Sequence, residues 1–149
     1  MKHYMLVLFP VCFDNWEFIE NLIKNNLIII DEKQKELDEK EKFRLIYTLY
    51  QGESWIGNAD NDWEGIKYKM NSCFNSKINF VKFFYAFSTE NKVKETKQEV
   101  RNFCKLGNHS IHSVDDEKMS NKIQSVIRFT LKSYTSISGG VFICLKLRE

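Results

Sequence analysis

Runs of apolar residues that alternate with amphipathic segments constrain this chain more than any other feature. The first run, Tyr4 to Phe9, is continuously apolar and ends at Pro10, which is typical of a strand buried inside a sheet. Ile78 to Phe87 is the run richest in aromatic and β-branched residues and predicts another strand. Two further strands are expected, from Leu27 towards Leu37 and from Val141 to Leu147. Such a chain should place helices on a sheet.

Helices are predicted between these strands, because apolar residues recur there at three- or four-residue spacing. They cover residues 15–25, 38–52, 62–74, 91–106 and 116–132, and residues 108–114 are expected to form a connector. Asp38 and Glu41 have the spacing of a capping box, and Asp14 is expected to cap the first helix with Glu17. Asp62 is expected to cap the third helix.

The order β-α-β-α-α-β-α-α-β predicts an α+β fold, a ferredoxin-like antiparallel sheet of four strands with helices covering one face. A small doubly wound fold is the alternative, but Phe9 to Cys12 stands where that fold has a glycine-rich turn. With 149 residues, of which 43% are hydrophobic, the chain is expected to form a single domain over residues 1–149.

The net charge, the hydropathy and the cysteine pattern exclude some classes of function and identify none. The formal net charge is +2, so a strongly basic nucleic-acid binder is not expected and nucleic acid is an improbable partner. No stretch approaches the ~20 apolar residues of a membrane span, so no membrane partner is expected. Cys12, Cys73, Cys104 and Cys144 are scattered without a C-x-x-C pair, which favours reduced thiols and a cytoplasmic location.

The densest cluster of chemically versatile residues is the segment 107–116, which holds two of the three histidines. A helical turn would place His109 and His112 on one side, and an extended stretch would place them on opposite sides. One interpretation is ordinary loop histidines beside a helix-capping aspartate. A second is a metal site of His109, His112 and either Asp115 or Asp116, which would serve a metal-dependent phosphoesterase.

A third interpretation is nucleophilic catalysis. A histidine whose ring is oriented by one hydrogen bond leaves its other nitrogen free to attack phosphorus, and His112 suits this role better than His109. Transfer of a phosphoryl group also needs cations near its oxygens, and the candidates are Arg101, Lys67 and Lys69.

The string Gly107-Asn-His-Ser-Ile-His112-Ser-Val-Asp115 resembles the signature of the nucleoside diphosphate kinases, in which a glycine precedes the phosphorylated histidine by five residues and an aspartate follows it by three. The order of elements and the chain length are also similar. The resemblance implies that His112 carries a phosphoryl group, with His109 and Asp115 in the same motif. It also implies that Arg101 binds phosphate and that Tyr50 or Tyr47 orients the histidine.

The implied ligand is a nucleotide such as ATP, bound with Mg²⁺, or another phosphorylated small molecule, and the family suggests a homo-oligomer. The sequence departs from the family at three residue positions, and the loop between the predicted 91–106 helix and the histidine motif is also much shorter than in the family. Phe9 replaces its phosphate-binding lysine, His109 replaces an asparagine, and Arg101 stands alone where the family supplies several arginines. Lys67 and Lys69 are the candidates to replace the missing cation.

A hypothesis of a different class is a non-catalytic module that binds protein or RNA on the sheet. Phe84 and Tyr85 would then be exposed on an open sheet face, and His112 would pack against the core.

Overall fold

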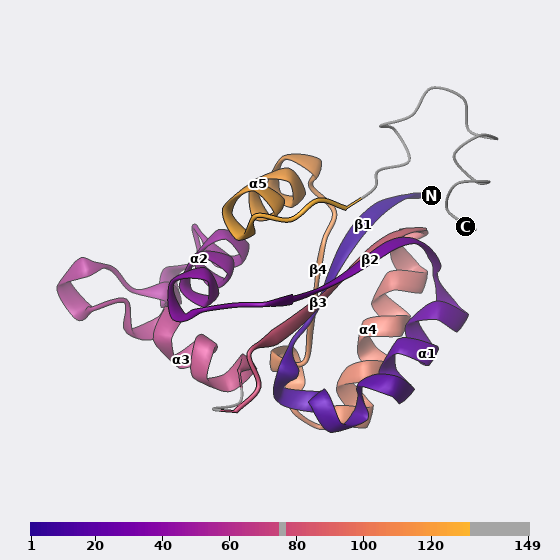
Figure 1. Cartoon of the computed structure of the whole chain (residues 1–149), viewed down its shortest axis with the longest axis horizontal. Coiled ribbons are helices and arrows are strands. Elements are labelled where there is room, and N and C mark those ends of the chain that lie inside the picture. The colour runs from indigo at the N-terminus through magenta and orange to yellow at the C-terminus, as the bar shows by residue number, and fades with distance from the viewer. Residues whose placement is uncertain (75–76, 132–149) are drawn as a thin grey trace.

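The computed structural model describes residues 1–74 and 77–131. Its centre is a four-stranded antiparallel sheet in the order β2-β3-β1-β4 (Figure 1). The strands are β1 (Lys2–Leu8), β2 (Ile28–Glu36), β3 (Phe80–Ser88) and β4 (Ile111–Val114). The helices are α1 (Trp16–Asn26), α2 (Glu39–Tyr50), α3 (Glu64–Cys73), α4 (Glu90–Cys104) and α5 (Glu117–Ile127). The predicted ferredoxin-like sheet with its helices is confirmed.

The fourth strand of this sheet lies in the segment that was expected to be a connector. β4 pairs antiparallel with β1, and His112 lies opposite Val7. Only four residues long and half polar, β4 has a weak local signal, and its pairing with a distant strand stabilises it. The strand predicted at 141–147, and residue 132 of the last predicted helix, lie outside the described residues.

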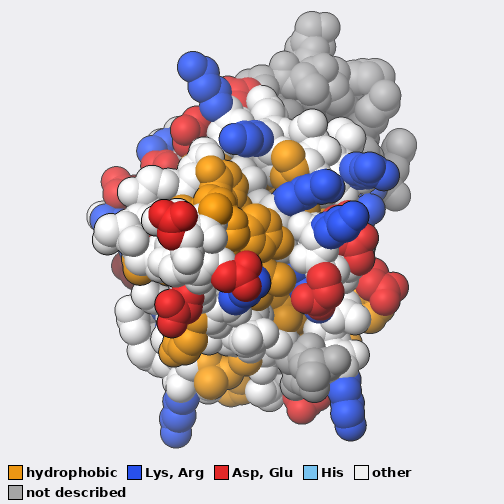
Figure 2. Space-filling model, turned by 90° about the vertical axis from the view of Figure 1, so that its left-hand side faces the viewer, with side chains coloured by type: hydrophobic (Ala, Val, Ile, Leu, Met, Phe, Trp, Pro, Cys, Tyr) orange, Lys and Arg blue, Asp and Glu red, His pale blue; other side chains and the backbone are white. Residues whose placement is uncertain are grey.

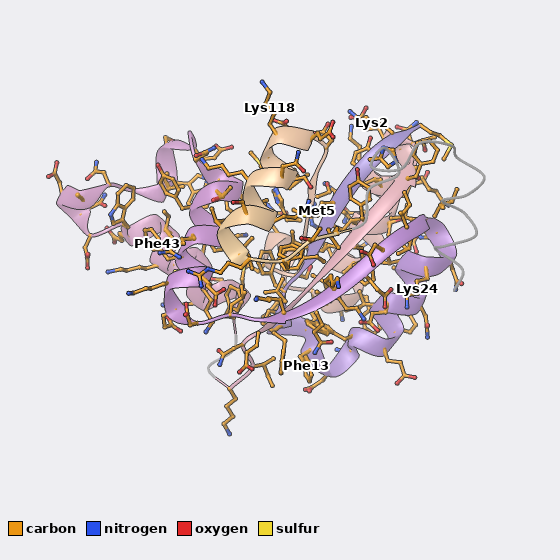
Figure 3. All side chains as sticks on the ribbon, turned by 45° about the horizontal axis from the view of Figure 1, so that its top comes forward. Lys2, Met5, Phe13, Lys24, Phe43 and Lys118 are labelled. Atoms are coloured by element: carbon orange, nitrogen blue, oxygen red, sulfur yellow. The ribbon has the colours of Figure 1, made fainter. Side chains whose placement is uncertain are left out.

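Helices cover both faces of the sheet, which corrects the expectation that they cover one. In Figure 1, α1 and α4 lie on one side of the strands, and α2, α3 and α5 lie on the other. Side chains of β1 accordingly alternate between two buried clusters, with Leu6 in the cluster of α1 and α4 and Met5 in the other. Met5 lies beneath α5, where Ser120 Oγ contacts its sulfur at 3.7 Å (Figure 3).

Burial on both faces bears directly on the hypothesis of an open, ligand-binding sheet. Phe84 is fully buried in the cluster of α1 and α4, and Tyr85 is buried in the cluster on the opposite face. Neither residue is available to stack on bases. Aromatic residues on both sides of β3 therefore form core.

The caps predicted at Asp38 for α2 and at the Asp115–Asp116 pair for α5 are confirmed, and those predicted at Asp14 and Asp62 are wrong. At α2, the Asp38 side chain accepts from the Glu41 amide at 2.8 Å and Glu41 accepts from the Asp38 amide at 3.1 Å. Asp14 does not cap α1, because it lies within a 3₁₀ segment, η1 (Pro10–Asn15), that starts at the proline. Asp62 does not cap α3, since it adopts left-handed backbone angles with a φ of 57° and is followed by another such residue.

Between α2 and α3 the chain forms two short 3₁₀ turns, η2 (Ser54–Ile56) and η3 (Ala59–Asn61). The first turn packs directly on α3 at Gly65, where a Cβ atom would lie 1.7 Å from the Trp55 carbonyl oxygen. Only glycine permits this approach. Figure 2 views this end of the molecule, where hydrophobic side chains gather among charged ones.

No helix within residues 1–74 and 77–131 combines the length and the apolar character needed to cross a bilayer.

Candidate functional site

His112 occupies the edge strand of the sheet. Side chains alternate along a strand, so His112 shares a face with Val114, and Ile111 points to the other. Val114 packs with the core of α2, α3 and α5, and Ile111 packs with that of α1 and α4. A paired strand therefore holds His112, and the two histidines of the motif do not share a helical turn.

The Tyr50 side chain, at the C-terminal end of α2, contacts the His112 ring. The Tyr50 hydroxyl lies 3.2 Å from His112 Nδ1, within hydrogen-bond distance, and the ring centroids are 5.0 Å apart in an edge-to-face arrangement. Burial raises the pKa of Tyr50 well above its usual value, so the group stays a neutral hydroxyl. Of the two predicted tyrosines, Tyr50 is thus the one that contacts the His112 ring, and the contact is made at Nδ1.

Lys69, on α3, places its ammonium beside His109, the other histidine of the motif. Its ammonium donates to the Asn108 carbonyl at 3.1 Å and lies 3.0 Å from His109 Nδ1. It also lies 5.2 Å from the centre of the Tyr50 ring. The side chain is buried, and this burial, together with nearby Arg101, lowers the pKa of Lys69. The α3 lysine that was predicted as a substitute cation therefore lies beside the histidine motif.

Arg101 of α4 supplies a second cation. Its Nη2 donates to the Ile111 carbonyl at 3.2 Å, which ties α4 to β4 beside His112. Its Nε is buried and has no hydrogen-bond partner among the described residues. Arginine carries its charge at any working pH, so this N–H is a buried donor that an anion would satisfy.

Lys97 is a third cation of the cavity, and it was not among the site residues predicted from the sequence. It lies four residues before Arg101 on α4, on the same helix face. Burial and the Arg101 charge lower the pKa of Lys97. The four-residue spacing between Lys97 and Arg101 is the sequence pattern from which Lys97 could have been predicted.

These side chains line one open cavity of about 540 Å³. Its lining residues are Tyr50, Glu53, Trp55, Tyr68, Lys69, Lys97, Arg101, Leu106, Gly107, Asn108, His109 and His112. Three of them are cationic and one, Glu53, is a carboxylate. In the part of the chain that the structure describes, none of the three cations forms an ion pair.

This environment sets the protonation state of His112. Burial lowers its pKa to about 4, and the charges of Lys97, Lys69 and Arg101 act in the same direction. The imidazole is therefore neutral at pH 7 and keeps a lone pair on one ring nitrogen. Burial and the Lys69 charge also lower the pKa of His109.

Two of the predicted site residues lie elsewhere. Asp115 is exposed and pairs with Lys2 at 3.0 Å, near the start of β1. Lys67 pairs with Asp62 at 2.5 Å and lines a separate hollow with Arg44 of α2. The structure brings His112, His109, Tyr50, Lys69 and Arg101 together, and it leaves Asp115 and Lys67 outside that cavity.

Phe9, which stands where the resembled family has a phosphate-binding lysine, does not line the cavity. The side chain is fully buried in the core of α2, α3 and α5 and packs edge-on against Phe74, with ring centroids 5.8 Å apart. The cation that lies beside the histidine motif is Lys69.

The arrangement does not support a metal-dependent phosphoesterase built on the histidine motif. Asp116 accepts from the Lys118 amide as the cap of α5, and Asp115 is engaged by Lys2. Across residues 1–74 and 77–131, no three histidine, cysteine, aspartate or glutamate side chains are grouped to hold a metal ion.

Comparison with known proteins identifies the fold. No protein-family model matches the chain, and no curated protein matches it by sequence. Among solved structures, the chain is similar to a nucleoside diphosphate kinase from Halobacterium salinarum in complex with CDP, with a TM-score of 0.52 and 12% identity over 95% of this chain and 97% of that one. A nucleoside diphosphate kinase from Aquifex aeolicus matches with a TM-score of 0.49 and 12% identity, over 85% of this chain and 94% of that one. The chain thus has a fold like that of the Halobacterium enzyme.

Proposed function

We propose that the cavity binds the phosphate groups of a nucleotide and that His112 accepts a phosphoryl group from it. The observation that carries this proposal is the cluster of Lys69, Lys97 and Arg101, which line one cavity without carboxylate partners in the described chain. Partly buried positive charges are costly unless an anion balances them. A phosphate group supplies that charge, and its oxygens match the donors of a guanidinium.

The protonation state of His112 supports the transfer step. A neutral imidazole has the lone pair needed to attack phosphorus, whereas an imidazolium has none. In the proposed first step, a new bond forms between His112 and the γ-phosphorus of a nucleoside triphosphate. The bond from that phosphorus to the bridging oxygen breaks, and a nucleoside diphosphate leaves with the electron pair. In the second step an acceptor oxygen attacks the phosphohistidine, and the nitrogen–phosphorus bond breaks.

Cations hold the charge in both steps. Arg101 and the two lysines would stabilise the oxygens of the transferring group, which is the main requirement of phosphoryl transfer. Mg²⁺ would enter as part of the nucleotide substrate. It is usually held by substrate phosphates with one or two carboxylates, and Glu53 is the carboxylate that lines the cavity.

Aromatic residues at the edge of the cavity favour a nucleotide over inorganic phosphate. Trp55 and Tyr68 line the cavity, and 43% and 67% of their respective surfaces are exposed. An exposed aromatic face can stack on a nucleobase with no preference for its identity. The Halobacterium nucleoside diphosphate kinase of similar fold, determined with CDP, is a further argument for a nucleotide ligand.

The proposal is tested by incubating the protein with γ-labelled ATP or GTP and magnesium and measuring protein-bound label that is acid-labile and base-stable. We expect label on the wild type and on His3→Ala, because His3 does not line the cavity. We expect none on His112→Ala. Equal labelling of the wild type and His112→Ala would contradict the assignment.

Nucleotide binding is measured separately, by titration with a non-hydrolysable triphosphate analogue. Lys69→Met and Lys97→Met should each weaken binding by about 10-fold or more, the usual worth of a hydrogen bond to a charged group. Lys94→Met is the matched control, since Lys94 lies on α4 but pairs with Glu90 at 3.1 Å. Equal affinity in all three variants would contradict a cationic phosphate site.

A further inference from the structure

The two histidines of the cavity have chemically different partners at the same ring nitrogen. His109 Nδ1 lies 3.0 Å from the Lys69 ammonium, and His112 Nδ1 lies 3.2 Å from the Tyr50 hydroxyl. Both rings line the same cavity. The difference between an ammonium and a hydroxyl therefore decides what each ring can do.

An ammonium group has three N–H donors and no lone pair. When Lys69 is charged, His109 Nδ1 must be the acceptor, and a neutral His109 then carries its proton on Nε2. That Nε2 has no lone pair with which to attack phosphorus. It is instead a hydrogen-bond donor.

A tyrosine hydroxyl both donates and accepts. The Tyr50 oxygen can accept a hydrogen bond from a proton-bearing His112 Nδ1, and in that tautomer His112 Nε2 keeps its lone pair. The partner of His112 is thus compatible with a nucleophilic ring, and the partner of His109 is not.

We propose that Lys69 fixes His109 as a neutral Nε2–H donor that binds a phosphate oxygen of the nucleotide, which leaves His112 as the single nucleophile. This inference rests on the proposed function, and it makes His109 a ligand-binding residue and Lys69 the residue that positions it. Lys69 is well placed for both tasks. Its ammonium donates one N–H to the Asn108 carbonyl and one to His109 Nδ1, so the third N–H is left to bind the same anion.

Nitrogen NMR of protein labelled with ¹⁵N-histidine tests the inference without a ligand. At a pH where both rings are neutral, His109 should show a proton-bearing Nε2 and a bare Nδ1. Lys69→Met should give a mixture of tautomers at His109. Lys97→Met is the matched control, because it removes a cation from the same cavity and leaves the Lys69 contact intact. A proton on His109 Nδ1 in the wild type, or no change in Lys69→Met, would overturn the inference.

A binding measurement tests whether His109 binds the nucleotide. His109→Leu should weaken binding of the triphosphate analogue by about 3- to 10-fold, and His109→Gln, which restores an N–H donor, should recover part of that loss. Unchanged affinity in His109→Leu overturns the inference even if His112 becomes phosphorylated. A wild type that shows the expected tautomer but binds no nucleotide overturns the proposed function, and with it the ligand role of His109.

Discussion

The Tyr50 hydroxyl and His112 Nδ1 lie 3.2 Å apart, a contact that joins the end of α2 to the edge strand of the sheet. The two residues are 62 positions apart in sequence. Because this contact engages Nδ1, Nε2 is the ring nitrogen that we propose attacks phosphorus, and Tyr50 is the most informative position to change first.

Tyr50→Phe should slow phosphorylation of His112 by about 3- to 10-fold, because loss of one hydrogen bond leaves the imidazole free to change tautomer and orientation. The measurement is the rate of label uptake from γ-labelled ATP. Tyr47→Phe is the matched control, since Tyr47 lies on the same helix and packs against Trp63 outside the cavity. Equal rates for the two variants would show that Tyr50 does not orient His112 for phosphorylation.

Stability should depend on the ionisation of His112. Its pKa is about 4 in the folded protein, below the usual value near 6.5, so the unfolded chain binds the proton more tightly. The stabilisation from the neutral, buried ring is therefore complete above about pH 6.5 and is lost as pH falls towards 4.

Urea unfolding of the wild type and of His112→Gln from pH 4 to pH 8 measures this effect. The free energy of unfolding should fall more steeply in the wild type as pH decreases, and the gap between the two proteins should be constant above neutral pH. The variant is needed because the pKa values of His3 and His109 are also lowered. Parallel curves for the two proteins would contradict a neutral, buried His112.

Arg101→Lys keeps the positive charge but removes the planar fork of donors. It should lose the bond to the Ile111 carbonyl and weaken binding of a triphosphate analogue by about 10-fold. The measurement is calorimetric titration at two salt concentrations. Arg44→Lys serves as control, because Arg44 lies on α2 beside a different hollow. If the two variants bind equally well, Arg101 acts only as a point charge.

Phe9→Lys should destabilise the fold by about 3 kcal/mol or more, since it leaves a cavity and places a charge in the core. It should add no phosphate affinity, although the nucleoside diphosphate kinases that the sequence resembles have a lysine there. Chemical unfolding of Phe9→Lys and of the milder Phe9→Leu measures the difference. A stable Phe9→Lys protein with tighter nucleotide binding would show that the cavity extends to β1.

The sequence predicted the parts of the fold that local patterns encode. The run at Tyr4 to Phe9 formed most of β1, one of the two inner strands of the sheet, and Asp38 and Glu41 formed their capping box. β4 was missed because Ile111–Val114 is short and half polar, and only its pairing with β1 makes it a strand. The covering of both sheet faces was missed as well, although a strand that is apolar on both sides indicates it.

Only part of the site was predicted, again because local patterns do not encode which distant segments pack together. The motif pointed to His112 and His109, and the preceding helix offered Arg101 as a nearby cation. Lys69 was one of two lysine candidates, and only the packing of α3 beside the motif separates it from Lys67. Lys97 was missed because its role depends on which face of α4 lines the cavity.

The most direct test of the account is to map the phosphorylated atom after reaction with γ-labelled ATP. Mass spectrometry under neutral conditions identifies the histidine, and ³¹P NMR distinguishes the two phosphohistidine isomers. We expect phosphate on His112 at Nε2, because Tyr50 engages Nδ1. Phosphate on His109, or a protein that binds ATP at this cavity and is never phosphorylated, would contradict it.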